Sequence, residues 1–323
     1  MTEAHSSAVD RELMKRLTIV VLFIFFFTAA FTRLDRVYSQ KFFDVTGQAY
    51  WIWAPHRISR NEPVVFFATR DFDLPEQRLY TSIKILGDPE YTLWFNGYEI
   101  AGRRVGDERE LDVYDVSKLA KTGRNRIVVA VRANQGVGGL LASVDLAPEV
   151  ENWVVTDARW KIYRRWRPDI LLRDSPDLGP AAPMLVGEPP IGRWNYVTSA
   201  SREFAQPFER TIPPREVFTM RALLPTIRTR AGVAISVADP VRAQAFDFGF
   251  TKGRVRLTIE GDATVSRAIT VRYANAREEL DRVEWATRAF VFAPGERTVI
   301  DPEVESFRYV LVYGGKAAAD VVQ

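Results

Sequence analysis

The stretch "YTLWFNGYEI" at residues 91–100 predicts a β-hairpin. Its apolar residues occupy alternate positions, the period-two pattern of a half-buried strand, at Tyr91, Leu93 and Phe95. The Asn-Gly pair that follows is the strongest short-range hairpin signal, because both central residues of a type I′ turn need a positive φ. We therefore expect two paired strands with these three side chains on the inward face.

Similar short runs fill most of the chain, so we expect an all-β fold. They are separated by Gly, Pro, Asn and Asp at the spacing of a β-sandwich, and no alternation of strands with helices points to a parallel sheet. The expected strands are 64–70, 79–86, 91–100, 126–133, 140–146, 232–238, 244–249, 254–260, 267–274, 287–293 and 307–313. The last of them is expected to close the fold near Tyr313.

The predicted organisation is two tandem, jelly-roll-like β-sandwich domains behind one N-terminal transmembrane helix. The expected parts are a cytoplasmic tail at 1–16, a transmembrane helix at 17–34, a first sandwich at 35–165, an irregular Pro-rich segment at 166–216 and a second sandwich at 217–323. Residues 166–216 lack clear periodicity and are too long for an ordinary loop, so they predict a linker or an irregular packing segment.

The N-terminal stretch "LTIVVLFIFFFTAAFT" contains sixteen residues without a charge. As a helix it would span about 24 Å, and flanking Lys15, Arg16 and Arg33 can extend to the headgroups across the rest of a ~30 Å hydrocarbon core. We favour an uncleaved anchor over two alternatives, a signal peptide cleaved after Ala30 and a buried core helix. The residues expected to face lipid or neighbouring helices are Leu17, Phe23, Phe25, Phe26, Phe27 and Phe31.

The composition excludes several kinds of chemistry. The chain has no Cys, which rules out disulfides, thiolate metal sites and Cys nucleophiles. Its only histidines are His5 and His56, which argues against a Ser-His-Asp triad or a His-rich metal site. The net charge of +3 without a long basic run does not favour nucleic-acid binding. We expect no cofactor and no metal.

Several motifs resemble the accessory domains of a known enzyme family. The segments are "FFATRDFDLP" (66–75), "YTLWFNGYEIAG" (91–102), "YDVSKLAKTGRNRIVVAV" (114–131), "FDFGFTKGRVRLTI" (246–259) and "ESFRYVLV" (305–312). In order and spacing they resemble the galactose-binding-like jelly roll and the second β-sandwich of α-L-rhamnosidase-type glycoside hydrolases. The resemblance covers most of residues 50–313 and implies two non-catalytic β-sandwiches.

The departures from that family concern its chemistry. There the two sandwiches accompany a large all-α barrel that carries the catalytic carboxylates, and no such barrel is expected after residue 313. Phe250-Thr251 and Ser306 stand where the family has Gln-Asn and Gly. No catalytic residue is carried over, so we expect a protein that is not an enzyme. Because the sandwiches resemble exported domains, we expect the N-terminus in the cytoplasm of a bacterium and the bulk in the periplasm, although the flanking charges are balanced.

The sequence offers one candidate docking site for a protein partner. In "WKIYRRWRPDILLRD" (160–174) cationic side chains alternate with aromatic ones, and both kinds are enriched at binding hot spots. The candidate residues are Arg164, Arg165, Trp166 and Arg167. The alternatives are a solvated basic edge and contact with anionic lipid headgroups.

Three tryptophans form a candidate glycan platform under a second hypothesis. Trp51 and Trp53 alternate with Ile52, and Trp94 lies on the opposite face of its strand from Leu93, so exposed indoles could stack on sugars. The alternative is that all three fill a core or an inter-domain contact, which the burial preference of Trp favours.

The function hypothesis that follows is an accessory or scaffold subunit of a larger bacterial membrane complex, held at the inner membrane by one helix. A narrower hypothesis, from the overall layout alone, is a photosynthetic reaction-centre–antenna complex. The second hypothesis is a membrane-tethered carbohydrate-binding protein, and the third is a degenerate glycosidase.

Overall fold

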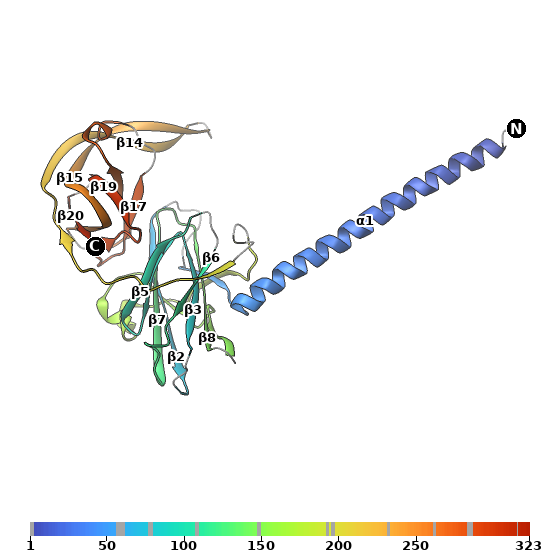
Figure 1. The fold of residues 1–323 in the computed structure, drawn as a ribbon, viewed down its shortest axis with the longest axis horizontal. Helices are drawn as coiled ribbons and strands as arrows, with labels where there is room; N and C mark the ends of the chain where they lie inside the picture. The colour runs from blue at the N-terminus through green and yellow to red at the C-terminus, as the bar shows by residue number, and fades with distance from the viewer. Residues whose placement is uncertain are drawn as a thin grey trace.

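The computed structural model describes residues 3–55, 62–76, 80–106, 110–146, 150–191, 194, 198–230, 233–260, 263–282, 287–314 and 316–323. One long helix, α1 (Glu3–Thr46), projects from a body made of β-sheets (Figure 1). Within it Met14–Leu34 is apolar enough to cross a membrane, with a mean hydropathy of 2.2 and none of its residues buried. All six predicted anchor residues are exposed along this stretch, as expected for a membrane anchor or a signal sequence.

The helix continues beyond its predicted end, so the first sandwich does not begin at residue 35. No Gly or Pro interrupts the chain between Leu34 and Thr46, and the helix therefore runs on as far as Thr46. Gly47 then adopts a φ of 60°, the left-handed conformation that commonly ends helices.

The first β-domain consists of two sheets. The first sheet has the strand order β11-β1-β8-β3-β6-β12, with β9 paired to β8, and the second has the order β10-β2-β7-β4-β5. Their bounds are β1 (Trp51–Trp53), β2 (Val64–Leu74), β3 (Ser82–Asp88), β4 (Glu90–Phe95), β5 (Tyr98–Arg104), β6 (Glu110–Asp115), β7 (Gly123–Ala133), β8 (Gly139–Leu146), β9 (Val150–Val155), β10 (Lys161–Tyr163), β11 (Met184–Gly187) and β12 (Thr198–Ser201). A core of side chains from both sheets fills the space between them.

The predicted hairpin is confirmed as β4–β5. Its two turn residues have positive φ, 51° at Asn96 and 87° at Gly97. The three side chains that were expected to point inward are fully buried, with exposed fractions of 0% for Tyr91, Leu93 and Phe95. The turn is fixed further by the Asn96 side chain, which donates to the Leu119 carbonyl at 2.9 Å.

Most of the segment 166–216 packs into the first domain, as the second of the two interpretations expected, but its end, with β13, pairs with β20 of the second domain. The segment contains β11, which pairs with β1, and β12, which runs parallel to β6. It also contains two short 3₁₀ helices, η1 (Pro168–Leu171) and η2 (Pro176–Leu178). These strands have four residues each, too few for a clear period-two pattern, and their partners lie more than 80 residues away in the sequence.

The second β-domain is one sheet that bends around its own core. Its strand order is β13-β20-β15-β19-β16-β17, and β14 and β18 also pair with β15. The bounds are β13 (Thr211–Ile212), β14 (Glu216–Arg230), β15 (Val233–Ile259), β16 (Arg267–Ala274), β17 (Arg288–Phe292), β18 (Thr298–Ile300), β19 (Glu305–Tyr313) and β20 (Ala317–Val322), and a 3₁₀ turn, η3, covers Arg277–Glu279.

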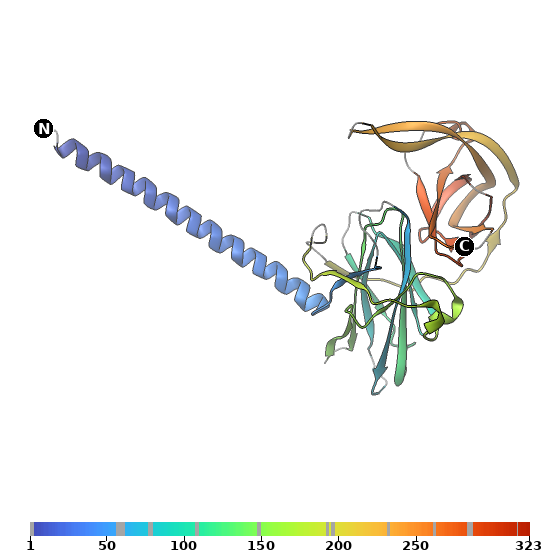
Figure 2. The ribbon, with the colours of Figure 1, turned by 180° about the vertical axis from the view of Figure 1, so that it is seen from behind.

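Three expectations for this domain need correction. Three separate strands predicted between 232 and 260 form one continuous strand, β15. Its partner β14 was not predicted as a strand. The domain also does not close at Tyr313, because β20 follows and pairs with β15. β14 and β15 together form a long ribbon, hereafter the arm, that extends away from the rest of the sheet (Figures 1 and 2).

Candidate functional site

The two β-domains are joined by a buried apolar layer. Val65, Phe67 and Val128 on the outward face of the β10-β2-β7-β4-β5 sheet form one cluster with Val291 and Ala293 from the second domain. A sheet with one face on its own core and the other under a second domain is covered on both sides. This explains why β7 is buried along most of its length rather than at alternate positions.

A buried ion pair crosses the same contact. Both side chains are almost completely buried, with 6% of Arg132 and 7% of Glu296 exposed. Arg132 donates two hydrogen bonds to the Glu296 carboxylate, at 2.6 and 2.7 Å, and a third at 2.7 Å to the Val291 carbonyl. Burial opposes the charged form of Arg132, but the paired carboxylate outweighs it and raises the arginine pKa above its usual range. Such a pair is costly to break, since either partner alone would be a buried, uncompensated charge.

The candidate docking residue Trp166 lies in this contact. Its ring packs on Phe67 with centroids 4.9 Å apart, and its backbone N–H donates to the Pro294 carbonyl at 2.8 Å. Gly295 lies so close that a Cβ there would come within 2.8 Å of the Trp166 carbonyl oxygen. Trp166 therefore contacts the chain's own second domain.

The three arginines of the same stretch differ from one another. Arg167 is held by two carboxylates, since its guanidinium donates to Asp169 and Asp177. Hydrogen bonds from Arg167 lower the pKa of Asp169 to about 2. Burial lowers the pKa of Arg164. Arg165 is the exposed member of the set.

The candidate glycan platform does not form as a surface. Trp51 and Trp53 are 0% and 1% exposed, so they belong to the core, as the alternative reading expected. Trp51 stacks on Trp194 with centroids 4.2 Å apart. Trp94 lies 6.1 Å from the Trp166 ring and is partly buried in the inter-domain layer. All three tryptophan side chains pack against other residues, because both faces of the sheets that carry them are covered by other parts of the chain.

A cleft of about 700 Å³ opens beside the inter-domain contact. The first domain contributes Arg103, Tyr114 and Arg202, and the second contributes Lys252 and Arg254. Phe208, from the segment that connects the domains, lies under the Arg254 guanidinium, which is 4.2 Å from its ring centroid.

The floor of this cleft is a buried polar network around Asp112, whose exposed fraction is 0%. Its carboxylate accepts hydrogen bonds from the Tyr91 hydroxyl at 2.5 Å and from Arg202 Nε at 2.9 Å, and it also pairs with Arg103. Burial raises the pKa of Tyr114, which lies 2.9 Å from the Tyr91 hydroxyl, to about 12. At neutral pH both phenols are therefore neutral: the Tyr91 hydroxyl holds the Asp112 carboxylate, and the Tyr114 hydroxyl holds that of Tyr91.

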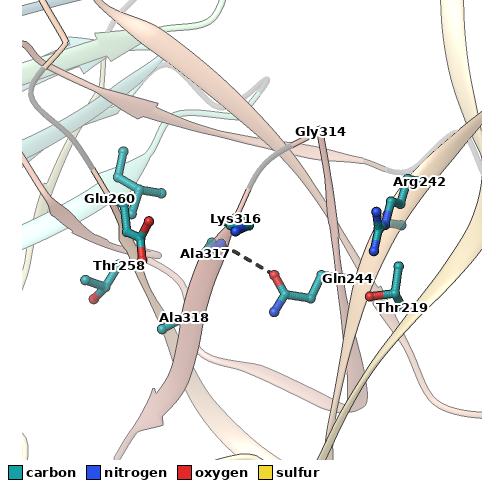
Figure 3. Close-up of a pocket in the computed structure, with 11 residues that line it drawn as sticks. Thr219, Arg242, Gln244, Thr258, Glu260, Gly314, Lys316, Ala317 and Ala318 are labelled. Carbon is teal, nitrogen blue, oxygen red and sulfur yellow. Dashed lines mark hydrogen bonds between the residues drawn. The ribbon is translucent and has the colours of Figure 1, made fainter.

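A second groove, of about 730 Å³, lies between the base of the arm and the start of β20. Figure 3 shows Thr219 and Arg242 from the arm on one side and Thr258, Glu260 and Lys316 on the other. Gln244 reaches across, and its side-chain oxygen accepts a bond from the Ala317 N–H at 3.4 Å. None of the described residues that line this groove is aromatic, and the groove is open to solvent.

The described part of the chain contains no group of three or more His, Asp or Glu side chains arranged to hold a metal ion. His56 lies outside the described residues. The two clefts present Arg, Lys, Thr and Gln side chains, which can bind polar or anionic groups through charge and hydrogen bonds.

Sequence reasoning missed the residues that form these features. Arg132 sits in a strand that otherwise reads as apolar, "IVVAVRA" (127–133), and an arginine at that place is the one signal that could have indicated a buried partner. Asp112 and Glu296 carry no comparable signal, since both lie in stretches that read as solvated edges and turns.

Comparison with known proteins gives structural neighbours alone. No family model and no curated protein matches the chain. An α-L-rhamnosidase from Dictyoglumus thermophilum is 17% identical, with a TM-score of 0.50 over 85% of this chain and 35% of that one. The native α-L-rhamnosidase from Aspergillus terreus is 16% identical, with a TM-score of 0.47 over 85% of this chain and 36% of that one. A lectin from Pleurotus ostreatus in complex with GalNAc is 13% identical, with a TM-score of 0.40 over 86% of this chain and 80% of that one.

The TM-score of 0.50 for the first of these neighbours establishes a likeness in fold. The resemblance to the β-domains of rhamnosidases is confirmed at that level by the first neighbour. The chain spans about a third of the length of the two rhamnosidases, 35% and 36%.

Proposed function

We propose that this chain is a non-enzymatic accessory subunit that is anchored in a bacterial membrane by one helix and contacts other subunits of a membrane complex through its β-domains. The observation that carries the proposal is the union of the two domains by the buried Arg132–Glu296 pair and the shared apolar layer. A scaffold needs surfaces at fixed positions, and a contact closed by buried charges and tightly packed side chains provides them. The exposed apolar helix would hold this body next to the bilayer.

The proposed topology has the N-terminus in the cytoplasm and the β-domains in the periplasm. This orientation rests on the resemblance of the two β-domains to exported domains, since the charges that flank the helix are balanced. We propose, more narrowly, that the complex is a photosynthetic reaction-centre–antenna complex. This narrower proposal rests on the layout of the chain.

Purification from native membranes in a mild detergent tests the proposal. The chain is expected to migrate with other membrane proteins in a complex much larger than its own 36.8 kDa, and pigment absorption in the same fraction would identify a photosynthetic host. A chain that purifies alone from native membranes would contradict the accessory role.

The anchor has its own test. Phe25→Arg places a charge at the centre of the apolar stretch, which costs about 2.5–3.5 kcal/mol on insertion scales, so the variant should leave the membrane fraction. Phe208→Arg, outside the helix, is the matched control and should stay there. A mature protein whose N-terminus lies near Phe31 would instead identify the helix as a signal sequence.

Carbohydrate binding is the second candidate, and the inter-domain cleft favours it. The cleft offers about 700 Å³, an aromatic ring at Phe208 and convergent cationic side chains, a combination that suits an acidic sugar. A glycan array probed with the detergent-solubilised full chain tests this. Binding to acidic glycans that Phe208→Ala weakens would support it, and a blank array would contradict it.

A further inference from the structure

The arm has a long unpaired edge. β14 and β15 pair over fifteen consecutive positions, from Glu216 opposite Asp247 to Arg230 opposite Val233. On the other side of β15, β19 begins to pair at Ala243. Among the described strands β14 pairs with β15 alone. One complete edge of β14 therefore has no strand beside it, and such an edge is a template for another strand.

The usual protection of an edge strand is confined to one part of β14. Pro225 lacks a backbone donor and interrupts pairing at its position. The preceding stretch, Val217–Leu224, contains no Pro, no Gly and no carboxylate. Val217 is 48% exposed although it is β-branched and apolar. This stretch is thus free to pair as far as its backbone and side chains are concerned.

The charge of the arm limits what can pair with it. Arg221 lies directly opposite Arg242, and both are exposed. Like charges at directly opposite positions destabilise a strand pair. Residues 215–242 contain five arginines and two carboxylates, so the excess of positive charge extends beyond this one pair of arginines. The cross-strand pairs on either side of it on the same face, Thr219–Gln244 and Leu223–Pro240, are neutral.

The opposite face of the arm is already occupied at its base. Phe218, Met220 and Leu224 pack on a small cluster that includes Leu280 and Tyr309 of the same domain. The Arg277 guanidinium also lies 5.1 Å from the Phe218 ring centroid. A new strand therefore would add at the edge of the ribbon and extend the sheet sideways.

We propose that Val217–Leu224 is a docking edge that takes an extended, acidic segment of a partner protein as an added β-strand. Backbone hydrogen bonds would bind the segment, and its carboxylates would lie beside Arg221 and relieve the repulsion from Arg242. A second copy of this chain fits poorly, because pairing two such edges adds cations and no carboxylate. The inference rests on the proposed accessory role and names the surface that serves it.

A peptide experiment on the full chain in detergent tests the edge directly. The probes are a short synthetic peptide of alternating glutamate and valine and the same peptide with lysine in place of glutamate. The glutamate peptide is expected to bind about tenfold more tightly, and the amides of residues 217–224 should exchange more slowly when it is bound. Equal binding of the two peptides, or slowed exchange only elsewhere, would overturn the proposal.

Charge-reversed variants sharpen the same test. Arg221→Glu combined with Arg242→Glu should reverse the preference toward the lysine peptide, whereas Lys252→Glu, an exposed cation of the inter-domain cleft, should leave it unchanged. Reconstitution into nanodiscs of phosphatidylglycerol or phosphatidylcholine, without peptide, separates lipid from protein. Slowed exchange at 217–224 in phosphatidylglycerol alone would assign the edge to lipid and overturn the proposal.

Co-purification from native membranes distinguishes failure of this inference from failure of the accessory role. If the unmodified chain brings partners and the doubly reversed variant keeps them at high salt, the edge is not the docking site and the accessory role stands. If the unmodified chain brings none, the accessory role fails, and the peptide result still decides the chemistry of the edge.

Discussion

Two of the hairpins in the molecule differ strongly in how far neighbouring strands cover them: β4–β5 in the first domain and β14–β15 in the second. β4 lies between β5 and β7, and Phe95 at its end is fully buried. β14 has one neighbour among the strands that the structure describes, and Val217 near its start is 48% exposed. Both obey the same antiparallel pairing rules. A two-stranded ribbon is only marginally stable in water, so the comparison predicts that neighbouring strands, more than the hairpin itself, determine stability.

The largest difference between the hairpins should appear on removing one aromatic ring from each. Phe95→Ala is expected to lower the free energy of unfolding by about 4 kcal/mol, because it leaves a cavity in a closed core. The matched change in the arm, Phe218→Ala, should cost less than about 1 kcal/mol, because this ring is partly solvated already. Urea unfolding of both variants measures the contrast. Similar losses would show that the arm is as tightly packed as the core.

The contact between the domains should respond almost as strongly. Glu296→Gln keeps the shape but removes the negative charge beside Arg132, which should cost about 3 kcal/mol. Asp320→Asn removes the carboxylate partner of Arg256 in a partly exposed pair on the second domain, and it should cost about 0.5 kcal/mol or less. Thermal melts of the two variants compare them. An equal, small effect would mean that the domains are not fixed by the buried pair.

The turn of the first hairpin provides a smaller effect. Gly97→Ala should cost about 1–2 kcal/mol, because an L-residue is unfavourable at a φ of 87°, and its Cβ would also come within 2.5 Å of Leu172. Gly106→Ala is the control, since that position has open space and no positive φ. The difference in melting temperature between the variants isolates the turn. A neutral Gly97→Ala would contradict the observed turn geometry.

The smallest effect concerns a carboxylate at the start of the same hairpin. Burial, only partly offset by Arg104 and Arg132, raises the pKa of Glu90 above its ordinary value of 4.5. The folded state then binds more protons than the unfolded state, so this group weakens folding as pH rises from 4.5 through the raised pKa. Glu90→Gln should therefore gain stability relative to the parent as pH increases over that window. A difference between parent and variant that is constant with pH would refute the raised pKa.

The two hairpins also differ in how well the sequence predicted them. The β4–β5 hairpin was predicted because its signal is local: alternation over five residues and an Asn-Gly turn. β16, β17 and β19 were located within about two residues for the same reason. β14 was missed because Pro225 and scattered arginines obscure its alternation, and β20 was missed because "AAADVV" is short and rich in alanine.

The candidate site could be predicted only in part. Arg and Trp at 164–167 indicated a contact, and Trp166 does make one, but its partner is the second domain of the same chain. Trp51 and Trp53 could have been exposed or buried on the same pattern. Which face of a strand meets solvent depends on whether another layer covers it, and the ring stacked on Trp51 belongs to Trp194, more than 100 positions away in the sequence.

The sequence by itself determined the apolar helix, the all-β character and the β4–β5 turn, because hydrophobic length, period-two alternation and positive φ are properties of neighbouring residues. Only the tertiary structure decided that Arg132 meets Glu296, that Trp94 and Trp166 lie between the domains, and that β14 keeps a free edge. These features depend on which distant segments come together, and the burial of a charge or the exposure of an edge has no meaning until they do.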